Sequence, residues 1–283
     1  MHNFKNISLL YFTCLTYKSL WESFFKLKNK YMDNTTIKTY LCTDILNDDH
    51  NIYQENNINI LTFNKKSNFT INGNLYDRIL FYLNNIDSKY ILFFIDDMYI
   101  MDYVNFNKLQ QLINIMENNE DIKIIKLSLD SFPFNNGKNV NYDNINFVQA
   151  DNSKDEYIFN VQPIIIRKDF FIDMVTYCKN NSTVTHQNGG LEIFGTKYFR
   201  INLNFKCLRV CKDIIKIPYS GGIVSSGIIS ENMKKFLKEK ENIEIKTYDN
   251  NLIFDLTKEE YECVGDRVKD VYKNINKKYS DNN

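Results

Sequence analysis

The stretch that most constrains the fold lies at residues 90–97, where the apolar run YILFFI ends in two adjacent aspartates, Asp96 and Asp97. A strand that is apolar at every position buries both of its faces, as the central strands of parallel sheets do when helices cover both sides. In open sheets of this kind, ligands bind beyond the carboxyl ends of the strands. The run therefore predicts a central strand that ends at a ligand site bearing two carboxylates.

The rest of the first half alternates between strands and helices. Short apolar segments predict strands, and apolar residues three or four positions apart predict helices. The predicted strands are residues 7–13, 37–42, 58–63, 90–95 and 122–129, and the predicted helices are about 18–31, 75–86 and 106–116. This order predicts an α/β fold with an open, mostly parallel sheet flanked by helices.

The second half of the sequence is less regular. Residues 141–157 are polar and predict a loop, residues 157–178 predict a strand that turns into a helix, and the glycines of residues 185–199 predict turns. We expect a further helix with Ser230 as its N-cap. A last helix is expected from Thr257, as part of a C-terminal helical extension.

Domain organisation and charge narrow the possible functions. No segment is rich enough in Pro, Gly or Ser to form a linker, so we expect residues 1–283 to be a single domain. The 35 basic residues balance the 35 acidic ones, which argues against a nucleic-acid partner. No apolar run approaches the roughly 20 residues of a transmembrane segment. Residues 7–17 lack the basic start and cleavage site of a signal peptide, so we expect a cytoplasmic protein.

The adjacent carboxylates of Asp96 and Asp97, at the end of an apolar strand, indicate a site for a metal ion. Two anions next to a low-dielectric wall are costly unless a positive charge neutralises them. Carboxylate oxygens suit Mn²⁺ or Mg²⁺, whose remaining positions are filled by water and by the phosphates of a ligand. The alternative is that Asp97 caps a turn and that Asp96 is solvated.

The ordered pattern resembles glycosyltransferases of the GT-A fold, whose DxD-type signature follows a buried strand. The segments that carry the resemblance are ISLLYFTCLTYKSL, CTD, NLYDRILFYLNN, YILFFIDDM, FNVQPIIIRKDFF and NGGLEIFGTKYF. They extend over about residues 5–230 and are most similar to the glycosyltransferases encoded by large DNA viruses and by some bacteria. The resemblance implies a GT-A-like, Rossmann-like sheet. Its nucleotide-binding half would span about residues 1–130, and the acceptor half with the C-terminal extension about residues 131–283.

The resemblance also implies substrates and roles. The donor would be a UDP- or GDP-sugar, and the acceptor a glycan or another hydroxyl compound. Asp97 would bind the metal ion, and Asp96 would face the hydroxyl groups of the ribose or of the sugar. The sequence has Ile-Asp-Asp in place of a strict D-x-D. This departure leaves the two roles exchangeable and the dependence on a metal open. If the virus-like resemblance holds, the protein would act in the cytoplasm of a host cell.

Glu192 is the candidate catalytic residue. It occupies the place where inverting GT-A enzymes often hold the general base that takes a proton from the acceptor hydroxyl. We expect Gly189 and Gly190 to permit a close backbone approach there. The alternative is an exposed Glu in the first turn of a helix. Asp130 is a rival base, and a retaining enzyme would need no base at this place.

Four further residues are candidates for nucleotide binding. Thr13 and Tyr17 follow the first strand, in the region that cradles the nucleobase in GT-A enzymes, although a plain packing role is favoured for Tyr17. Asp44 follows the second strand and could accept a hydrogen bond from the base or the ribose. Arg78 could pair with the diphosphate or with Asp96, or it could be solvated on its helix.

Two other functions remain open. A nucleotidyltransferase could have a similar sheet and similar carboxylates, but it normally brings a Gly-rich, Lys/Arg-bearing loop after the first strand, and FTCLTYKSL contains neither Gly nor Arg. A non-catalytic module that binds a nucleotide or a sugar would bind its ligand equally well with and without metal.

Overall fold

The structure is a computed structural model that describes residues 4–32, 37–45, 58–64, 75–129, 133–182, 188–218, 224–225 and 228–245. The helix expected from Thr257 and the alternative base Asp130 lie outside these residues. In the described part of the chain, no helix combines the length and the apolar character needed to cross a bilayer.

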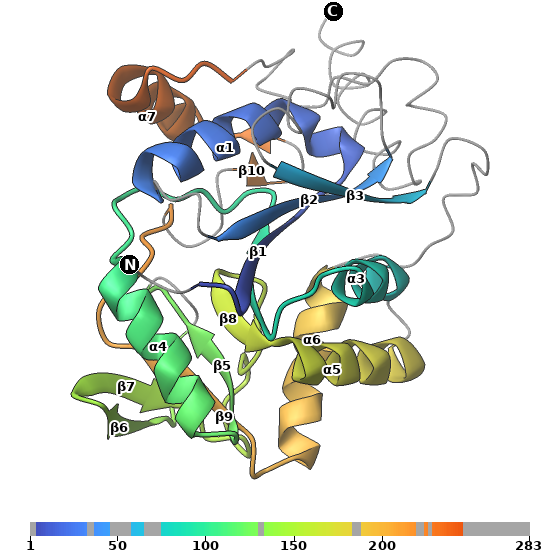
Figure 1. Cartoon of the computed structure of the whole chain (residues 1–283), viewed down its shortest axis with the longest axis vertical. Coiled ribbons are helices and arrows are strands. Elements are labelled where there is room, and N and C mark those ends of the chain that lie inside the picture. The colour runs from blue at the N-terminus through green and yellow to red at the C-terminus, as the bar shows by residue number, and fades with distance from the viewer. Residues whose placement is uncertain are drawn as a thin grey trace, which may run out of the picture.

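Nine strands of the described residues form one mixed sheet in the order β3-β2-β1-β4-β8-β5-β9-β7-β6 (Figure 1). They are β1 (Ile7–Phe12), β2 (Lys38–Ile45), β3 (Ile58–Asn64), β4 (Tyr90–Ile95), β5 (Ile122–Lys126), β6 (Lys138–Tyr142), β7 (Ile145–Gln149), β8 (Ile164–Arg167) and β9 (Lys206–Val210). Strands β1 to β4 pair in parallel, as expected for an α/β sheet. β8 lies antiparallel between β4 and β5. Two short strands, β10 (Val224–Ser225) and β11 (Ile228–Ile229), pair separately.

Helices cover both faces of the sheet. They are the short 3-10 turn η1 (Leu15–Tyr17), α1 (Lys18–Tyr31), α3 (Leu75–Asn84), α4 (Phe106–Asn118), α5 (Lys168–Asn181), α6 (Asn188–Ile201) and α7 (Glu231–Glu241). Figure 1 shows α7 beside α1, where Lys30 and Tyr31 each donate a hydrogen bond to Glu241. The expected N-cap of α7 is confirmed, because the Ser230 hydroxyl accepts from the Met233 N–H.

Side chains of the central strands alternate between the two helical layers. On one face, the Tyr11 ring of β1 stacks on Phe24 of α1 with 3.8 Å between ring centroids. Phe94 of β4 meets the same Phe24 ring at 5.8 Å. Aromatic pairs at such distances add to the free energy gained from burial alone. These contacts fix α1 against β1 and β4.

On the other face, the neighbouring residues of the same strands meet α3 and α5. Phe12 of β1 lies 6.0 Å from the Tyr82 ring of α3. Phe93 of β4 lies 5.3 Å from the Phe171 ring of α5. All six residues of β4 are buried, which explains why this strand carries no polar residue before Asp96. The predicted central strand covered on both sides is therefore confirmed.

The loop predicted at residues 141–157 is wrong in its first part. β6 and β7 form an antiparallel hairpin in which Tyr142 pairs with Ile145. The two residues between them, Asp143 and Asn144, have φ angles of 48° and 61°. Two-residue hairpin turns with positive φ favour Asn and Asp, and such a turn lets a polar segment form a hairpin. The strands could not be predicted from apolar residues, because β6 is largely solvent-exposed and carries polar side chains.

The turns predicted at residues 185–199 are wrong for residues 188–199, because α6 runs from Asn188 to Ile201, and residues 185–187 lie outside the described residues. Gly195 serves close packing within this helix. A Cβ atom at that position would lie 2.9 Å from the Phe159 ring and 3.2 Å from the Met174 sulfur. The glycine therefore lets α6 approach α5 and the segment that precedes β8.

Candidate functional site

The carboxyl ends of three parallel strands bring the predicted residues together. Phe12 at the end of β1 pairs with Cys42 of β2 on one side and with Ile95 of β4 on the other. Thr13, Asp44 and Asp96 therefore lie along one edge of the sheet. Ligands of open parallel sheets bind beyond the carboxyl ends of the strands, and these polar side chains lie at that edge.

Arg78 of α3 joins the first two of these strand ends. Its Nη2 donates a hydrogen bond of 2.6 Å to the Thr13 carbonyl, and its Nη1 lies 3.9 Å from Asp44 Oδ2. The guanidinium also lies over the Phe12 ring, 5.0 Å from the centroid. Burial is the largest influence on Arg78 and lowers its pKa, but Asp44, Tyr82 and Cys14 together raise the pKa of the guanidinium above its usual value. The alternative of a solvated Arg78 is therefore wrong. Its positive charge also opposes the rise in the pKa of Asp96 that burial causes.

Thr13 does not fit the predicted contact with a nucleobase. Its side chain is buried, and its hydroxyl accepts a hydrogen bond of 2.9 Å from the Trp21 indole. Its N–H donates to the Cys42 carbonyl. Because these groups and the Thr13 carbonyl already have partners within the chain, Thr13 supports the loop after β1. Tyr17 is partly buried and packs against the core, in agreement with the packing alternative.

Asp44 keeps a partly exposed position at the end of β2. Its Oδ1 accepts hydrogen bonds from the Leu15 N–H at 2.8 Å and from the Thr43 hydroxyl at 3.3 Å. The carboxylate therefore fixes the loop between β1 and α1. Its other oxygen faces Arg78.

Asp96 and Asp97 form a turn directly after β4. The Tyr11 hydroxyl donates a 3.0 Å hydrogen bond to the Asp96 carbonyl and so holds the backbone of this turn. In the described part of the chain, neither carboxylate forms a salt bridge, and Asp97 Oδ1 is a buried oxygen without a hydrogen-bond partner. Burial, followed by the neighbouring Asp97 charge, raises the pKa of Asp96 well above its usual value. Burial, with a further contribution from Glu192, raises the pKa of Asp97 to about 7.

Glu192 of α6 acts electrostatically on Asp97, which follows β4. Glu192 lies in the second turn of α6, and its side chain is half-buried. It accepts a 3.1 Å hydrogen bond from the Val161 N–H. The alternative of an exposed glutamate in the first turn of a helix is therefore wrong. Burial raises the pKa of Glu192, while the Val161 N–H and the Lys126 charge oppose this rise. Gly189 and Gly190 lie within the helix and make no turn before Glu192.

Sequence reasoning missed Lys126, the last residue of β5. The side chain is fully buried, and its Nζ donates a 2.7 Å hydrogen bond to the Tyr157 carbonyl and lies 4.4 Å from the centroid of the Phe134 ring. Burial lowers its pKa to about 8. The signal in the sequence is a lysine within the apolar run IKIIKL, which is ambiguous because Lys123 of the same run is only partly buried.

The carboxylates of the β4 turn suit part of a divalent cation site. Among the described residues, no cluster of three or more His, Cys, Asp and Glu side chains forms a complete protein cage. At nucleotides, Mg²⁺ typically takes only one or two carboxylates and completes its shell with water and phosphate oxygens. A buried carboxylate oxygen without a partner fits this arrangement, and Asp97 supplies one.

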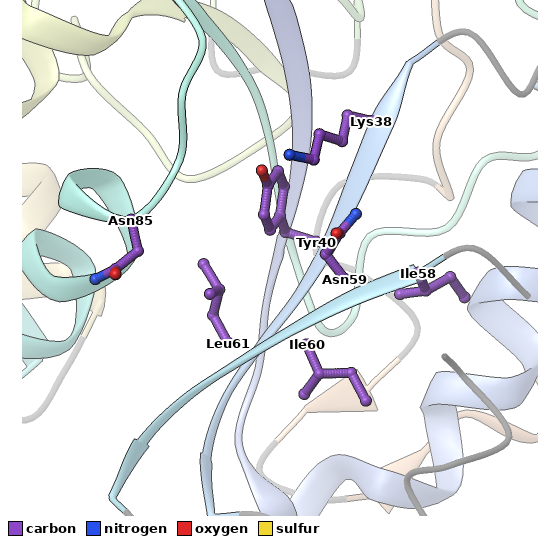
Figure 2. A pocket seen from close by; sticks show the side chains of 7 residues that line it. All are labelled: Lys38, Tyr40, Ile58, Asn59, Ile60, Leu61 and Asn85. Carbon is purple, nitrogen blue, oxygen red and sulfur yellow. The ribbon is translucent and has the colours of Figure 1, made fainter. Parts of the chain in front are cut away.

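A separate open pocket of about 730 Å³ lies at the amino-terminal halves of β2 and β3, away from the strand ends that bear the carboxylates. Figure 2 shows Tyr40 and Leu61 on the side of the strands that faces Asn85, whereas Ile60 points away. None of the predicted site residues lines this pocket. Its position therefore supports no role in the chemistry expected at the Asp96–Asp97 turn.

No protein-family model and no curated protein matches the sequence. Among solved structures, the fold is similar to S. aureus TarS 1–349 in complex with UDP-GlcNAc, at 13% identity and a TM-score of 0.47, over 78% of this chain and 62% of that one. It is similar to the glycosyltransferase GlyE of Streptococcus pneumoniae TIGR4 at 10% identity and a TM-score of 0.45, over 72% and 45% of the two chains.

A nucleotidyltransferase also has a similar fold. It is the 4-diphosphocytidyl-2C-methyl-D-erythritol synthase of Anaerococcus prevotii, at 10% identity and a TM-score of 0.41, over 85% of this chain and 98% of that one. This chain spans less than two thirds of the TarS 1–349 chain in the UDP-GlcNAc complex and of GlyE. These values describe a partial likeness of fold, and they assign no substrate to this chain.

Proposed function

We propose that this chain is a glycosyltransferase that moves a sugar from a UDP- or GDP-sugar to the hydroxyl group of a glycan or another acceptor. The observation that supports this most is the meeting of Asp97 and Glu192 at the carboxyl end of β4. Asp97 offers a buried oxygen without a partner, and Glu192 lies close enough for its charge to raise the pKa of Asp97. A cation ligand and a base within electrostatic reach of each other suit a transfer that needs both a metal ion and a general base.

In this proposal, Asp97 holds Mn²⁺ or Mg²⁺ at the diphosphate of the donor. A divalent cation there would stabilise the negative charge that grows on the diphosphate as the glycosidic bond breaks. Asp96 faces the hydroxyl groups of the ribose or the sugar. Asp44 lies farther along the same edge, on the side of the nucleobase.

Glu192 acts as the general base. Its carboxylate takes the proton of the acceptor hydroxyl while that oxygen attacks the anomeric carbon, and the bond from that carbon to the diphosphate breaks. Attack from the face opposite the leaving group inverts the anomeric configuration. The raised pKa of Glu192 supports this role, because a base is most effective when its pKa lies near the working pH.

A screen of nucleotide sugars for Mn²⁺-dependent hydrolysis tests the proposal, since it needs no knowledge of the acceptor. We expect one UDP- or GDP-sugar to release free sugar and nucleoside diphosphate, and Asp97→Asn to abolish this release while far-UV circular dichroism stays unchanged. Asp155→Asn is a suitable control because Asp155 is a buried carboxylate that only accepts hydrogen bonds within the chain. Release of pyrophosphate from a nucleoside triphosphate and a sugar phosphate would instead identify a nucleotidyltransferase.

A further inference from the structure

Asn160 is a fully buried polar residue with one unsatisfied atom. Its amide nitrogen donates a 2.9 Å hydrogen bond to Gln162 Oε1. Its Oδ1 is buried and has no hydrogen-bond partner among the described residues. A buried carbonyl oxygen without a donor destabilises the folded chain. Such an oxygen is available to a ligand that comes from outside the chain.

The sheet places Asn160 beside the Asp96–Asp97 turn. β8 runs antiparallel to β4, with Phe93 opposite Ile164. Because the two strands run in opposite directions, the segment that leads into β8, which contains Asn160, lies toward the carboxyl end of β4. A second observation agrees, because the Val161 N–H donates to Glu192, and Glu192 is a close electrostatic neighbour of Asp97.

Asn160 Oδ1 and Asp97 Oδ1 are thus two buried acceptor oxygens toward the same end of the sheet, and both lack a donor. Two acceptors cannot satisfy each other, whereas a cation between them satisfies both. An amide carbonyl is a hard oxygen ligand of the kind that divalent cations take together with carboxylates. We infer that Asn160 is a second protein ligand, with Asp97, of the divalent cation; this inference rests on the proposed function.

Asn152 provides a matched control. It is also a buried asparagine, its amide nitrogen also donates to one acceptor, the Phe205 carbonyl at 2.7 Å, and its Oδ1 also lacks a partner. It follows β7, four strands away from β4 in the order of the sheet. Truncating it removes an equivalent buried amide without touching the Asp96–Asp97 turn.

The test is a titration of the metal-free full-length chain with Mn²⁺ alone, in which electron paramagnetic resonance measures the free ion. We expect Asn160→Ala to weaken binding by about tenfold or more. Asn152→Ala should bind like the unchanged chain, and Asp97→Asn should not bind. Asn160→Asp keeps an oxygen and adds a charge, so it should bind at least as tightly as the unchanged chain. If Asn160→Ala does not fold, the Mn²⁺ affinity of Asn160→Asp tests the inference in its place.

Two results separate the inference from the proposed function. If the unchanged chain binds Mn²⁺ and Asp97→Asn does not, but Asn160→Ala binds within twofold of the unchanged chain, Asn160 is not a ligand and the cation site at Asp97 stands. If Asn160→Ala and Asn152→Ala weaken binding equally, the effect is structural and the inference is overturned. If the unchanged chain and Asp97→Asn bind alike, the cation site itself is refuted, and the role of Asn160 falls with it.

Discussion

Asp97→Asn should stabilise the metal-free protein at neutral and alkaline pH. The structure raises the pKa of Asp97 from an ordinary 3.8 to about 7, chiefly through burial. At 1.36 kcal/mol for each unit of pKa, this difference corresponds to about 4 kcal/mol against the folded, ionised state. Because the side chain is partly reached by water, we expect about 2 kcal/mol of this penalty to be relieved when a neutral amide replaces the carboxylate.

The stabilisation by Asp97→Asn should depend on pH. A carboxyl group with a raised pKa keeps the chain fully stable below its unfolded pKa near 3.8, and this stability is lost as the pH rises through about 7. The asparagine variant does not ionise. Its advantage should therefore be absent near pH 4, grow between pH 4 and 7, and remain constant above that.

Urea unfolding in the presence of EDTA, followed by far-UV circular dichroism at several pH values, measures this difference. Adding Mn²⁺ at pH 8 should stabilise the unchanged chain and leave Asp97→Asn unaffected. Asp155→Asn should lower the free energy of unfolding instead, because the Asp155 carboxylate accepts from the N–H groups of Asn136 and Asp151. A destabilised Asp97→Asn variant, or an advantage that does not vary with pH, would refute the reasoning.

Three further predictions concern other parts of the structure. Glu192→Gln should lower the transfer rate by about 10²–10⁴-fold with nucleotide affinity unchanged, and a rate within threefold of the original in a steady-state assay would contradict the base role. Lys126→Met removes a buried cation whose pKa has fallen to about 8, and it also removes the hydrogen bond to the Tyr157 carbonyl. We expect the free energy of unfolding in urea at pH 7 to rise by about 1 kcal/mol, and a fall of that size would contradict this expectation. Gly195→Ala should cost about 1–3 kcal/mol by the same measurement, since its Cβ would overlap the Phe159 ring; an unchanged midpoint would show that α6 can shift.

The parallel half of the fold could be predicted from the sequence because burial there leaves a visible pattern. The run YILFFI predicted β4 with its observed bounds, and the helical spacing predicted α1 from Lys18 to Tyr31. The β6–β7 hairpin left no such pattern, since one side of β6 faces water and its residues are mainly Lys and Asn. Its signal was the Asp143–Asn144 turn, which needs positive φ at both positions.

The site could be predicted only in part. Position along the chain was enough to place Asp44, Asp96 and Asp97 at one edge of the sheet. It could not show which way a side chain points, so Thr13 was assigned to a nucleobase although its hydroxyl bonds to Trp21. Asn160 interrupts the apolar run YIFNVQPIII, and a polar residue in such a run was the available signal. That Asn160 lies toward the same end of the sheet as Asp97 depends on how β8 pairs with β4, and this pairing could not be predicted from the sequence.

Diffraction from crystals soaked with Mn²⁺ and UDP locates the proposed cation directly, because the anomalous signal of manganese marks the ion without reference to activity. We expect one anomalous peak within about 2.0–2.6 Å of an Asp97 oxygen, with the diphosphate on the other side of the ion. A peak elsewhere in the molecule, with Asp97 Oδ1 bonded to a protein group, would contradict this expectation.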